Sequence, residues 1–239
     1  MVASTEDHGA PIGRRVVLGM LGLGAAGVVG GAPLVRAVGN FLRPLTANDP
    51  TGLSDLLPGA GAFRLYTVTS GFPIAPPAYR LVVDGLVDRP LSLSLADLEA
   101  MAPVHLVKPF QCVTGWRVPG VHWTGVALGH LLDLAGVAKA GRALRFESFD
   151  GVYTESLTLA QARRPDVVVA YRMLGAPLTR EHGGPVRLYV APMYGYKSIK
   201  WLQRISVVDR VEPGYWEHYG YAVDAWVGRS NGRSDPPIG

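Results

Sequence analysis

The chain contains a single cysteine, Cys112, among its 239 residues. One cysteine cannot form an intrachain disulfide, so this chain must be held together by a packed core and not by cross-links. Hydrophobic residues make up 48% of the chain and charged residues only 18%, which suits one domain with a sizeable core. Cys112 is left with three roles, namely packing, nucleophilic attack or ligation of a soft metal.

The N-terminal residues have the layout of an export signal. Arg14 and Arg15 precede an uncharged, glycine-rich run over residues 16–35, and Arg36 follows it. An adjacent arginine pair before a weakly apolar stretch predicts a twin-arginine leader at residues 1–36, and hence a periplasmic or other extracytoplasmic location. That route carries folded proteins and suits a cofactor inserted in the cytoplasm. The alternative is an uncleaved membrane anchor, since about 20 apolar residues can span a bilayer.

The rest of the chain alternates β-rich and short helical segments. Residues 37–62 contain three prolines and little periodicity, which predicts an extended linker before a folded domain at residues 63–239. We expect a helix over 95–101 with Ser94 as its N-cap, a helix over 124–134 with Thr124 as its cap, and a helical turn at 159–162. Strands are expected at 79–87, 104–107, 142–149, 167–171, 186–190 and 205–208. Short helices among many strands predict an α+β fold with mixed sheets.

Several familiar catalytic and binding motifs are excluded, because residues that each motif requires are missing from the sequence. The six histidines contain no pair spaced by three or four residues, as a helical zinc site requires. No histidine follows Ser230 in its Gly-x-Ser-x-Gly sequence, which excludes a nucleophile elbow. The Gly195-Tyr-Lys-Ser sequence lacks the first glycine of a phosphate loop, because Ala191 occupies that position. The net charge of +4 comes with no basic run interleaved with aromatic residues, so we expect no nucleic-acid partner.

Two glycine-rich stretches near basic residues indicate anion recognition. Gly183 and Gly184 precede Arg187, and Gly195 precedes Lys197. Glycine lets backbone N–H groups approach a phosphate, and the two cations supply charge-assisted hydrogen bonds. The alternative is a hairpin whose basic residues only face water. Taken singly, Cys112 and His182 have packing roles as alternatives too.

Together these motifs resemble a known family. The sequence runs from Tyr-Arg-Leu-Val-Val-Asp-Gly-Leu-Val at 79–87 to Cys-Val-Thr-Gly-Trp at 112–116. It then continues with His-Gly-Gly-Pro-Val-Arg at 182–187 and Tyr-Gly-Tyr-Lys-Ser-Ile-Lys-Trp at 194–201. This order is similar to that of the sulfite oxidase-type molybdopterin oxidoreductases over roughly residues 60–210. Within the family it is most similar to the catalytic subunits of periplasmic methionine-sulfoxide reductases.

The resemblance implies a cofactor and its ligands. Cys112 would be the thiolate ligand of molybdenum, which also carries the dithiolene of one pyranopterin; a soft thiolate suits this centre. His182 falls where reductases of the family commonly have asparagine and sulfite-oxidising members have histidine. The other implied cofactor contacts are Arg187, Gly195, Tyr196 and Lys197 at the phosphate, and Arg64, Tyr66, Thr67 and Ser148 at the pterin.

The residues after Cys112 favour a reduction. Sulfite-oxidising relatives place arginines there, whereas here Arg117 is the one nearby cation in the sequence, with Trp116 and Trp123 close by. A neutral sulfoxide such as methionine sulfoxide therefore fits better than sulfite. The alternatives are a sulfite dehydrogenase-like oxidation and a non-catalytic, membrane-anchored binding module. The chain has neither a Cys-x-x-Cys-His haem motif nor a cysteine cluster, so electrons would come from a partner, such as a membrane haem or quinone-linked subunit.

Overall fold

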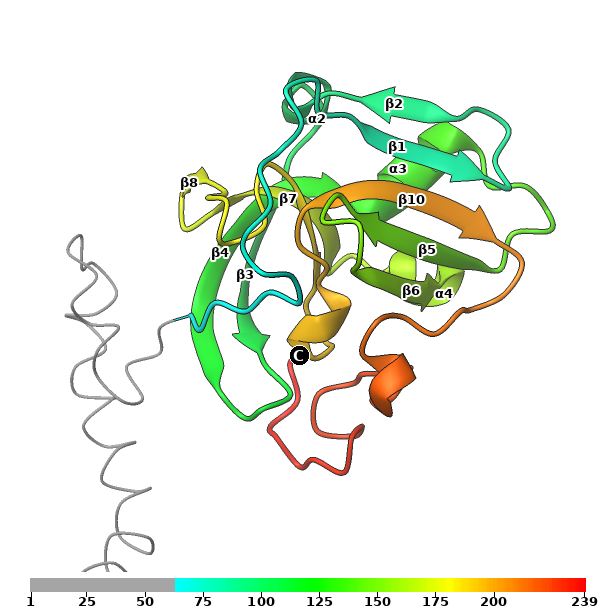
Figure 1. The fold of residues 1–239 in the computed structure, drawn as a ribbon. Helices are drawn as coiled ribbons and strands as arrows, with labels where there is room; N and C mark the ends of the chain where they lie inside the picture. The colour runs from blue at the N-terminus through cyan, green and yellow to red at the C-terminus, as the bar shows by residue number, and fades with distance from the viewer. Residues whose placement is uncertain (1–62) are drawn as a thin grey trace, which may run out of the picture. The chain divides into compact units, whose positions relative to one another are not determined.

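Two five-stranded sheets organise the part of the chain that the computed structural model describes, residues 63–239. The predictions for the leader and the linker fall outside these residues. The strands are β1 (Leu81–Gly85), β2 (Leu91–Leu93), β3 (Val104–Gln111), β4 (Arg117–Ala127), β5 (Ala143–Ser148), β6 (Thr154–Thr158), β7 (Val167–Met173), β8 (Ala176–Pro177), β9 (Arg187–Val190) and β10 (Leu202–Val208). Short helices connect them, namely α2 (Leu95–Glu99), α3 (Leu128–Ala135), α4 (Leu159–Ala162), η2 (Gly195–Lys197) and η3 (Glu217–Tyr219). This arrangement confirms the α+β prediction (Figure 1).

The first sheet has the strand order β2-β1-β10-β5-β6. β1 pairs with β10 in parallel, with Val82 opposite Arg204, and the other neighbours are antiparallel. Gly85 ends β1 with a positive φ of 82°, and a Cβ there would lie 2.3 Å from the carbonyl oxygen of Val207. Only glycine allows β1 and β10 to approach so closely at this point.

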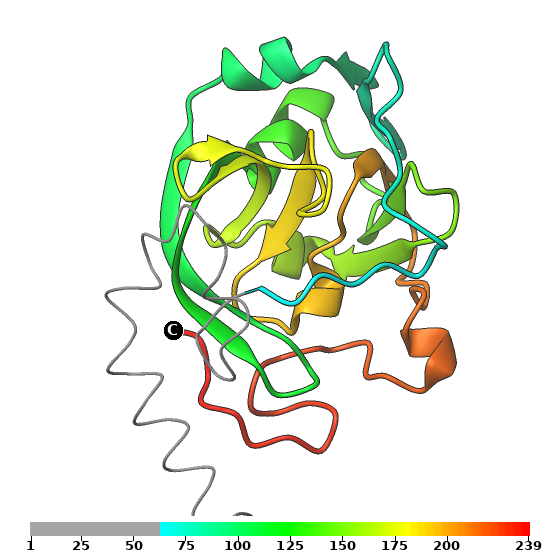
Figure 2. The ribbon, with the colours of Figure 1, turned by 60° about the vertical axis from the view of Figure 1, so that its left-hand side comes forward.

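The second sheet has the order β3-β4-β7-β8, and β9 also pairs with β7. Its long β3–β4 hairpin carries Cys112 at the tip, and both views show the hairpin reaching toward the C-terminal segment (Figures 1 and 2). The pairing of β4 with β7 shifts register between Thr124 and Gly125. A Cβ on Gly125 would lie 2.2 Å from the carbonyl oxygen of Val169, so the two strands are in contact at this glycine.

The expected helix over 124–134 begins four residues later than its sequence indicates. Thr124 lies inside β4, and α3 begins at Leu128 after Ala127, which makes no side-chain capping hydrogen bond. β4 has β3 on one side and β7 on the other, and these two ladders outweigh the preference of threonine for a helix N-cap. The cap at Ser94 is confirmed, because its side chain accepts a hydrogen bond from the amide of Asp97 in a capping box.

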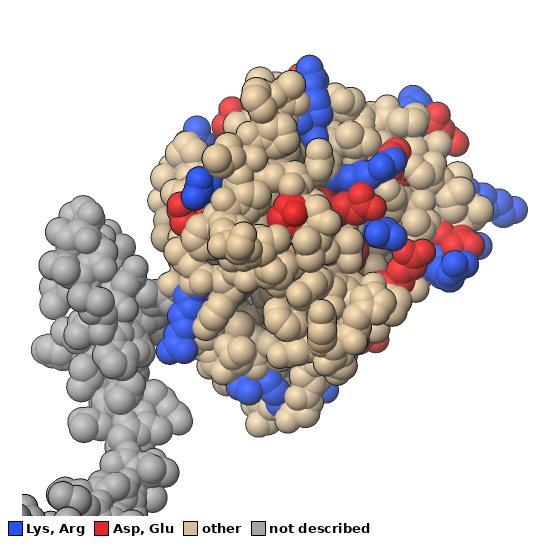
Figure 3. All heavy atoms as spheres, viewed as in Figure 1, with Lys and Arg blue, Asp and Glu red and all other residues tan. Residues whose placement is uncertain are grey.

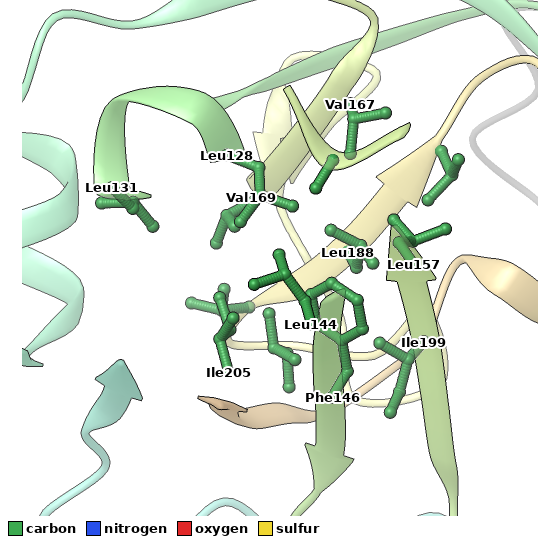
Figure 4. Close-up of a cluster of buried hydrophobic side chains, with 14 of the residues drawn as sticks. Leu128, Leu131, Leu144, Phe146, Leu157, Val167, Val169, Leu188, Ile199 and Ile205 are labelled. Carbon is green, nitrogen blue, oxygen red and sulfur yellow. The ribbon is translucent and has the colours of Figure 1, made fainter. Parts of the chain in front are cut away.

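Two hydrophobic clusters lie on opposite faces of the second sheet. Along β7, Val167 and Val169 belong to the larger cluster, while Val168 and Ala170 belong to the smaller one. Strand side chains alternate between faces, and covering both faces explains why residues 167–170 are all apolar and fully buried. The larger cluster joins α3 to both sheets, and its labelled side chains point toward one another in Figure 4. The smaller cluster contains Phe110 and packs against Trp116, both near Cys112.

Charged side chains are spread over the face of the described domain that Figure 3 shows. On the face shown in Figure 3, lysine and arginine alternate with aspartate and glutamate, and large areas carry no charge. Within residues 63–239, no helix is long and apolar enough to cross a membrane.

Candidate functional site

A cavity of about 370 Å³ gathers most of the residues that the sequence motifs single out. Its walls come from the segment at 63–68, the tip of the β3–β4 hairpin, the stretch from η2 to residue 201, the segment around η3, and residues 153, 181, 182 and 187. Of the predicted site residues, those lining it are Arg64, Tyr66, Thr67, Cys112, His182, Arg187, Gly195 and Tyr196. The fold thus brings together residues up to 132 positions apart in the sequence, Arg64 and Tyr196 being the outermost of them.

The hairpin turn holds Cys112 at the cavity. The backbone amide of Cys112 donates to the carbonyl of Trp116, and the amide of Gly115 donates to the carbonyl of Cys112. Gly115 adopts a φ of 105°, which a side chain would oppose. The half-buried thiol lies 3.2 Å from the hydroxyl of Thr114. Arg117 points away from this cavity lining, because its guanidinium donates to Gln111 Oε1 and to the carbonyl of Pro236.

Arg187 is a buried cation at the first residue of β9. Its side chain is almost completely enclosed, and the guanidinium donates to the carbonyls of His182 and Ser198, both at 2.8 Å. It also lies 5.6 Å from the ring centre of Phe110. Burial lowers the pKa of Arg187 to about 10, so the side chain stays charged at neutral pH. Arg187 therefore ties the 182 and 198 segments together while keeping its positive charge beside the cavity.

Lys200 adds a second cation that the sequence prediction did not include. Its ammonium donates to the carbonyls of Tyr66 and Glu181, at 2.5 and 3.1 Å, and lies 4.2 Å from a ring centre of Trp201. Burial, followed by repulsion from Arg187, lowers the pKa of Lys200 to about 7. We call Arg187 and Lys200 the cationic wall.

His182 is a neutral lining residue near the cationic wall. Burial, then repulsion from Arg187 and Lys200, lowers the pKa of His182 to about 4. The imidazole therefore carries no charge at neutral pH. It lies against the ring of Phe63, with a centre-to-centre distance of 5.0 Å in an edge-on arrangement.

A second set of lining residues is aromatic, and two of its four members come from the segment around η3. We call Tyr153, Tyr196, Trp216 and Tyr221 the tyrosine wall. The ring of Tyr221 lies 5.5 Å from those of both Tyr196 and Trp216, and the hydroxyl of Tyr153 donates to the carbonyl of Tyr196 at 2.7 Å. Burial raises the pKa of Tyr153 and Tyr196, so both are neutral phenols. No sequence motif indicated Trp216 or Tyr221, because the tail around them has no clear period.

Two predicted site residues do not line the cavity. Lys197, which the family pattern assigns to the phosphate, is 1% exposed and directs its ammonium to Glu155 and Glu217. Ser148 is buried at the end of β5, where its hydroxyl accepts from the amide of Asp150. Ser198 and Lys200, one and three residues after Lys197, line the cavity instead. Trp123, expected near the thiol, is buried and stacks on Tyr189.

The comparisons with known proteins agree with this geometry. The family model described as "Oxidoreductase molybdopterin binding domain" matches residues 69–216. The chain belongs to this family. This molybdopterin-binding domain includes every strand of the described residues and the segments that carry Cys112, Arg187 and Lys200.

Relatives of this molybdopterin oxidoreductase include enzymes with different named reactions. The uncharacterized oxidoreductase YuiH of Bacillus subtilis is 34% identical over 66% of this chain and 86% of its own. Chicken (Gallus gallus) sulfite oxidase is 34% identical over 62% of this chain but only 39% of its own length. The matched region makes up 46% of the sulfite oxidase of Arabidopsis thaliana. The protein-methionine-sulfoxide reductase catalytic subunit MsrP of Ralstonia nicotianae is 30% identical, over 60% and 47%. The chain therefore spans less than half the length of the two sulfite oxidases and of MsrP.

A solved structure shares the fold of the family. The sulfane dehydrogenase SoxCD from Paracoccus pantotrophus superposes with a TM-score of 0.53 and 26% identity, covering 59% of this chain and 41% of that one. Together with the family match, this likeness shows that the chain is a molybdenum cofactor-dependent oxidoreductase with the sulfite oxidase-type fold.

The residues of the cavity fit a molybdopterin. Cys112 has a soft sulfur of the kind that would suit molybdenum, and among the described residues no cluster of three or more His, Cys, Asp or Glu side chains offers an alternative metal site. The indole nitrogen of Trp116, another lining residue, is buried without a partner, so its N–H is a donor free to bind a cofactor. A phosphate between Arg187 and Lys200 would offset the repulsion that lowers the pKa of Lys200.

Proposed function

We propose that this chain is the molybdopterin subunit of an exported oxidoreductase that removes the oxygen atom from a sulfoxide, such as methionine sulfoxide. The observation that supports it most directly is that Cys112 lines the same cavity as the cationic wall and the uncharged tyrosine wall. The cationic wall suits the anionic cofactor. The tyrosine wall suits a neutral substrate with an apolar methyl group.

The cofactor, with one pyranopterin, supplies the two-electron chemistry when bound, and the chain's residues hold and enclose it. Cys112 would ligate the metal. Arg187, Lys200 and the backbone near Gly195 would hold the phosphate, while the segment Arg64–Tyr66–Thr67 and the Trp116 indole would contact the pterin. In the overall reaction the sulfoxide takes up two electrons and two protons and yields a sulfide and water. Trp216 and Tyr221 would hold the sulfur substituents and keep bulk water from the reacting oxygen.

The surroundings of the thiol support a neutral substrate over sulfite. The lining residues next to Cys112 in the sequence are Val113, Thr114 and Trp116, none of which carries a charge. Arg117 is engaged by Gln111 and the Pro236 carbonyl. Sulfite would lose its hydration here with little charge compensation.

The second candidate is sulfite oxidation. It is favoured by His182, which matches the residue common in sulfite-oxidising members, and by Arg64, a further cation of the cavity lining. If the phosphate engages only Lys200, Arg64 and Arg187 would remain to attract an anionic substrate.

The two candidates differ in their specificity constants. On one metal-loaded preparation, we expect kcat/KM for methionine sulfoxide with an artificial low-potential donor to exceed kcat/KM for sulfite with an acceptor by at least about tenfold, equivalent to about 1.4 kcal/mol. Both reactions would be measured at the same pH and ionic strength, because sulfite binding depends on screening. A larger constant for sulfite would replace the reductase proposal by the sulfite dehydrogenase alternative.

We also propose export by the twin-arginine route, with the leader either cleaved or kept as an anchor, and electron delivery by a separate membrane haem or quinone-linked subunit. The arginine pair supports twin-arginine export, and the single cysteine, which leaves no iron–sulfur ligand set, supports electron delivery by another subunit.

Changing Arg14 and Arg15 to lysine keeps the charge but removes the guanidinium pair. Cell fractionation should then find folded, molybdenum-containing protein retained in the cytoplasm, whereas normal export of this variant would refute the route.

A further inference from the structure

A lysine and two glutamates form a fully buried cluster behind the tyrosine wall. The Lys197 ammonium lies 2.6 Å from Glu155 Oε2 and 2.5 Å from Glu217 Oε1, and each of the three side chains is at most 1% exposed. The other oxygen of Glu217 accepts from the amide of Gly214, and Glu155 Oε2 also accepts from the amide of Ser156. With the side chains of both glutamates at this distance, the ammonium is not available to a cofactor phosphate.

Each member of the cluster comes from a different segment, and each segment supplies a residue of the tyrosine wall. Lys197 follows Tyr196 in η2, and Glu217 follows Trp216 at the start of η3. Glu155 lies on β6, two residues after Tyr153. The segment around η3 has only one short helix and no strand, so its position depends on contacts such as this ion pair.

The cluster carries one carboxylate more than its single ammonium can balance. Glu155 Oε1 is buried without a partner, which is the expected place for a proton. Burial raises the pKa of Glu155 to about 8; Lys197 opposes this shift and Glu217 reinforces it. The other titratable groups facing it are Tyr153 and Tyr196, whose phenols are neutral. Glu155 therefore holds a proton at neutral pH, beside the 2.5 Å contact between Lys197 and Glu217.

We propose that Lys197 is a positioning residue, which fixes the tyrosine wall by joining η2 to β6 and η3, and that it is not a ligand of the cofactor phosphate. Glu217 is the partner that places Trp216 and Tyr221, because it belongs to the same short segment as both. Lys200 remains the lysine of the cavity itself. This inference rests on the proposed function only in treating the tyrosine wall as the substrate side.

The test compares Lys197→Met with the matched variant Lys200→Met in the full-length, cofactor-loaded protein. For Lys197→Met we expect amide hydrogen exchange over residues 214–221 to quicken by about tenfold or more, with molybdenum content within about twofold of the parent. KM for a methyl sulfoxide should rise more than kcat falls. Lys200→Met should show the reverse pattern, with molybdenum lost and exchange over 214–221 unchanged. Loss of molybdenum from Lys197→Met with unchanged exchange would overturn the inference and restore Lys197 as a phosphate ligand.

A second pair of variants keeps the inference testable if Lys197→Met does not fold. Glu217→Gln retains the shape but weakens the tie to η3, so exchange over 214–221 should again quicken while molybdenum is kept. Glu155→Gln mimics the protonated acid and should leave that exchange within about twofold of the parent. Equal effects of the two glutamine variants would contradict the assignment of Glu217 as the positioning partner. Amide hydrogen exchange and molybdenum content are measured without substrate. They therefore test this inference even if sulfite, and not a sulfoxide, is the substrate.

The raised pKa of Glu155 predicts the direction in which the stability of the protein changes with pH. Between an ordinary glutamate pKa and about 8, the folded state holds a proton on Glu155 that the unfolded state has lost. Stability from this group must therefore fall as the pH rises through that window and level off above pH 8. Melting curves of Glu155→Gln should show a smaller fall between pH 5 and 8 than the parent, and an identical fall would show that Glu155 does not hold the proton.

Discussion

Replacing Cys112 by alanine is expected to abolish turnover while leaving the fold intact. The thiol is half-buried in a turn held by backbone hydrogen bonds of Cys112 and Gly115, and neither bond needs the sulfur. Loss of the only soft ligand should reduce kcat by more than about 100-fold, and Cys112→Ser should be nearly as inactive because an oxygen ligand changes the electronics of the metal. Steady-state turnover and molybdenum content, measured on the same preparation, check this result.

The matched control is Thr114→Ala in the same turn. Its hydroxyl lies 3.2 Å from the Cys112 sulfur, but it is not part of the backbone hydrogen bonds that hold the turn. We expect a fall in kcat of less than about tenfold with unchanged circular dichroism and Tm. Turnover of the parent level in metal-loaded Cys112→Ala would refute the ligand assignment, whatever the substrate.

Arg187→Ala is expected to combine a large loss of stability with loss of the cofactor. The substitution leaves the buried carbonyls of His182 and Ser198 without their charged donor and opens a gap beside Phe110. Hydrogen bonds to a charged group contribute about 1.5 to 3 kcal/mol each, so we expect the free energy of unfolding to fall by about 3 to 5 kcal/mol. Denaturant unfolding measures the stability, and metal analysis measures the retained cofactor.

Arg172→Ala is the comparison for this variant. Arg172 lies on the neighbouring strand β7, with its side chain 42% exposed and only a 3.8 Å ion pair to Glu99. Exposed pairs of this kind contribute little, so the change in unfolding free energy should stay within about 0.5 kcal/mol. Similar losses in Arg187→Ala and Arg172→Ala would show that the buried guanidinium does not tie the cavity segments together.

Local sequence rules predicted the elements whose signals are themselves local. The Ser94 cap, the turn at 159–162 and the strands around Val83 and Val168 all follow from capping chemistry or from runs of β-branched residues. The helix expected from Thr124 is present but begins only at Leu128, because β4 is paired on both sides, and no local sequence records which strands will pair. β6 was missed for a related reason, since its buried Glu155 and Ser156 do not look apolar in the sequence.

The candidate site also has features that the local sequence predicts and features that it does not. The motifs around Cys112, His182 and Gly195 mark segments that the fold brings to one cavity. The choice between Lys197 and Lys200 could not be made from the sequence, because both follow Gly195 within five residues and carry the same charge. Only the positions of Glu155 and Glu217, 42 residues before and 20 after Lys197, distinguish the buried lysine from the one in the cavity.

The parallel pairing of β1 with β10 sets the order in which this protein can be completed during synthesis. In the first sheet, β1–β2 and β5–β6 are two hairpins that meet only through β10. A ribosome must therefore release the chain beyond Val208 before the hairpins can join, and beyond Tyr221 before the cavity has all its walls. Contacts this distant in sequence form slowly, because a long loop must close first. A prematurely ended chain would expose unpaired strand edges of both hairpins, a state that proteases and chaperones recognise, and only a finished domain could receive the cofactor.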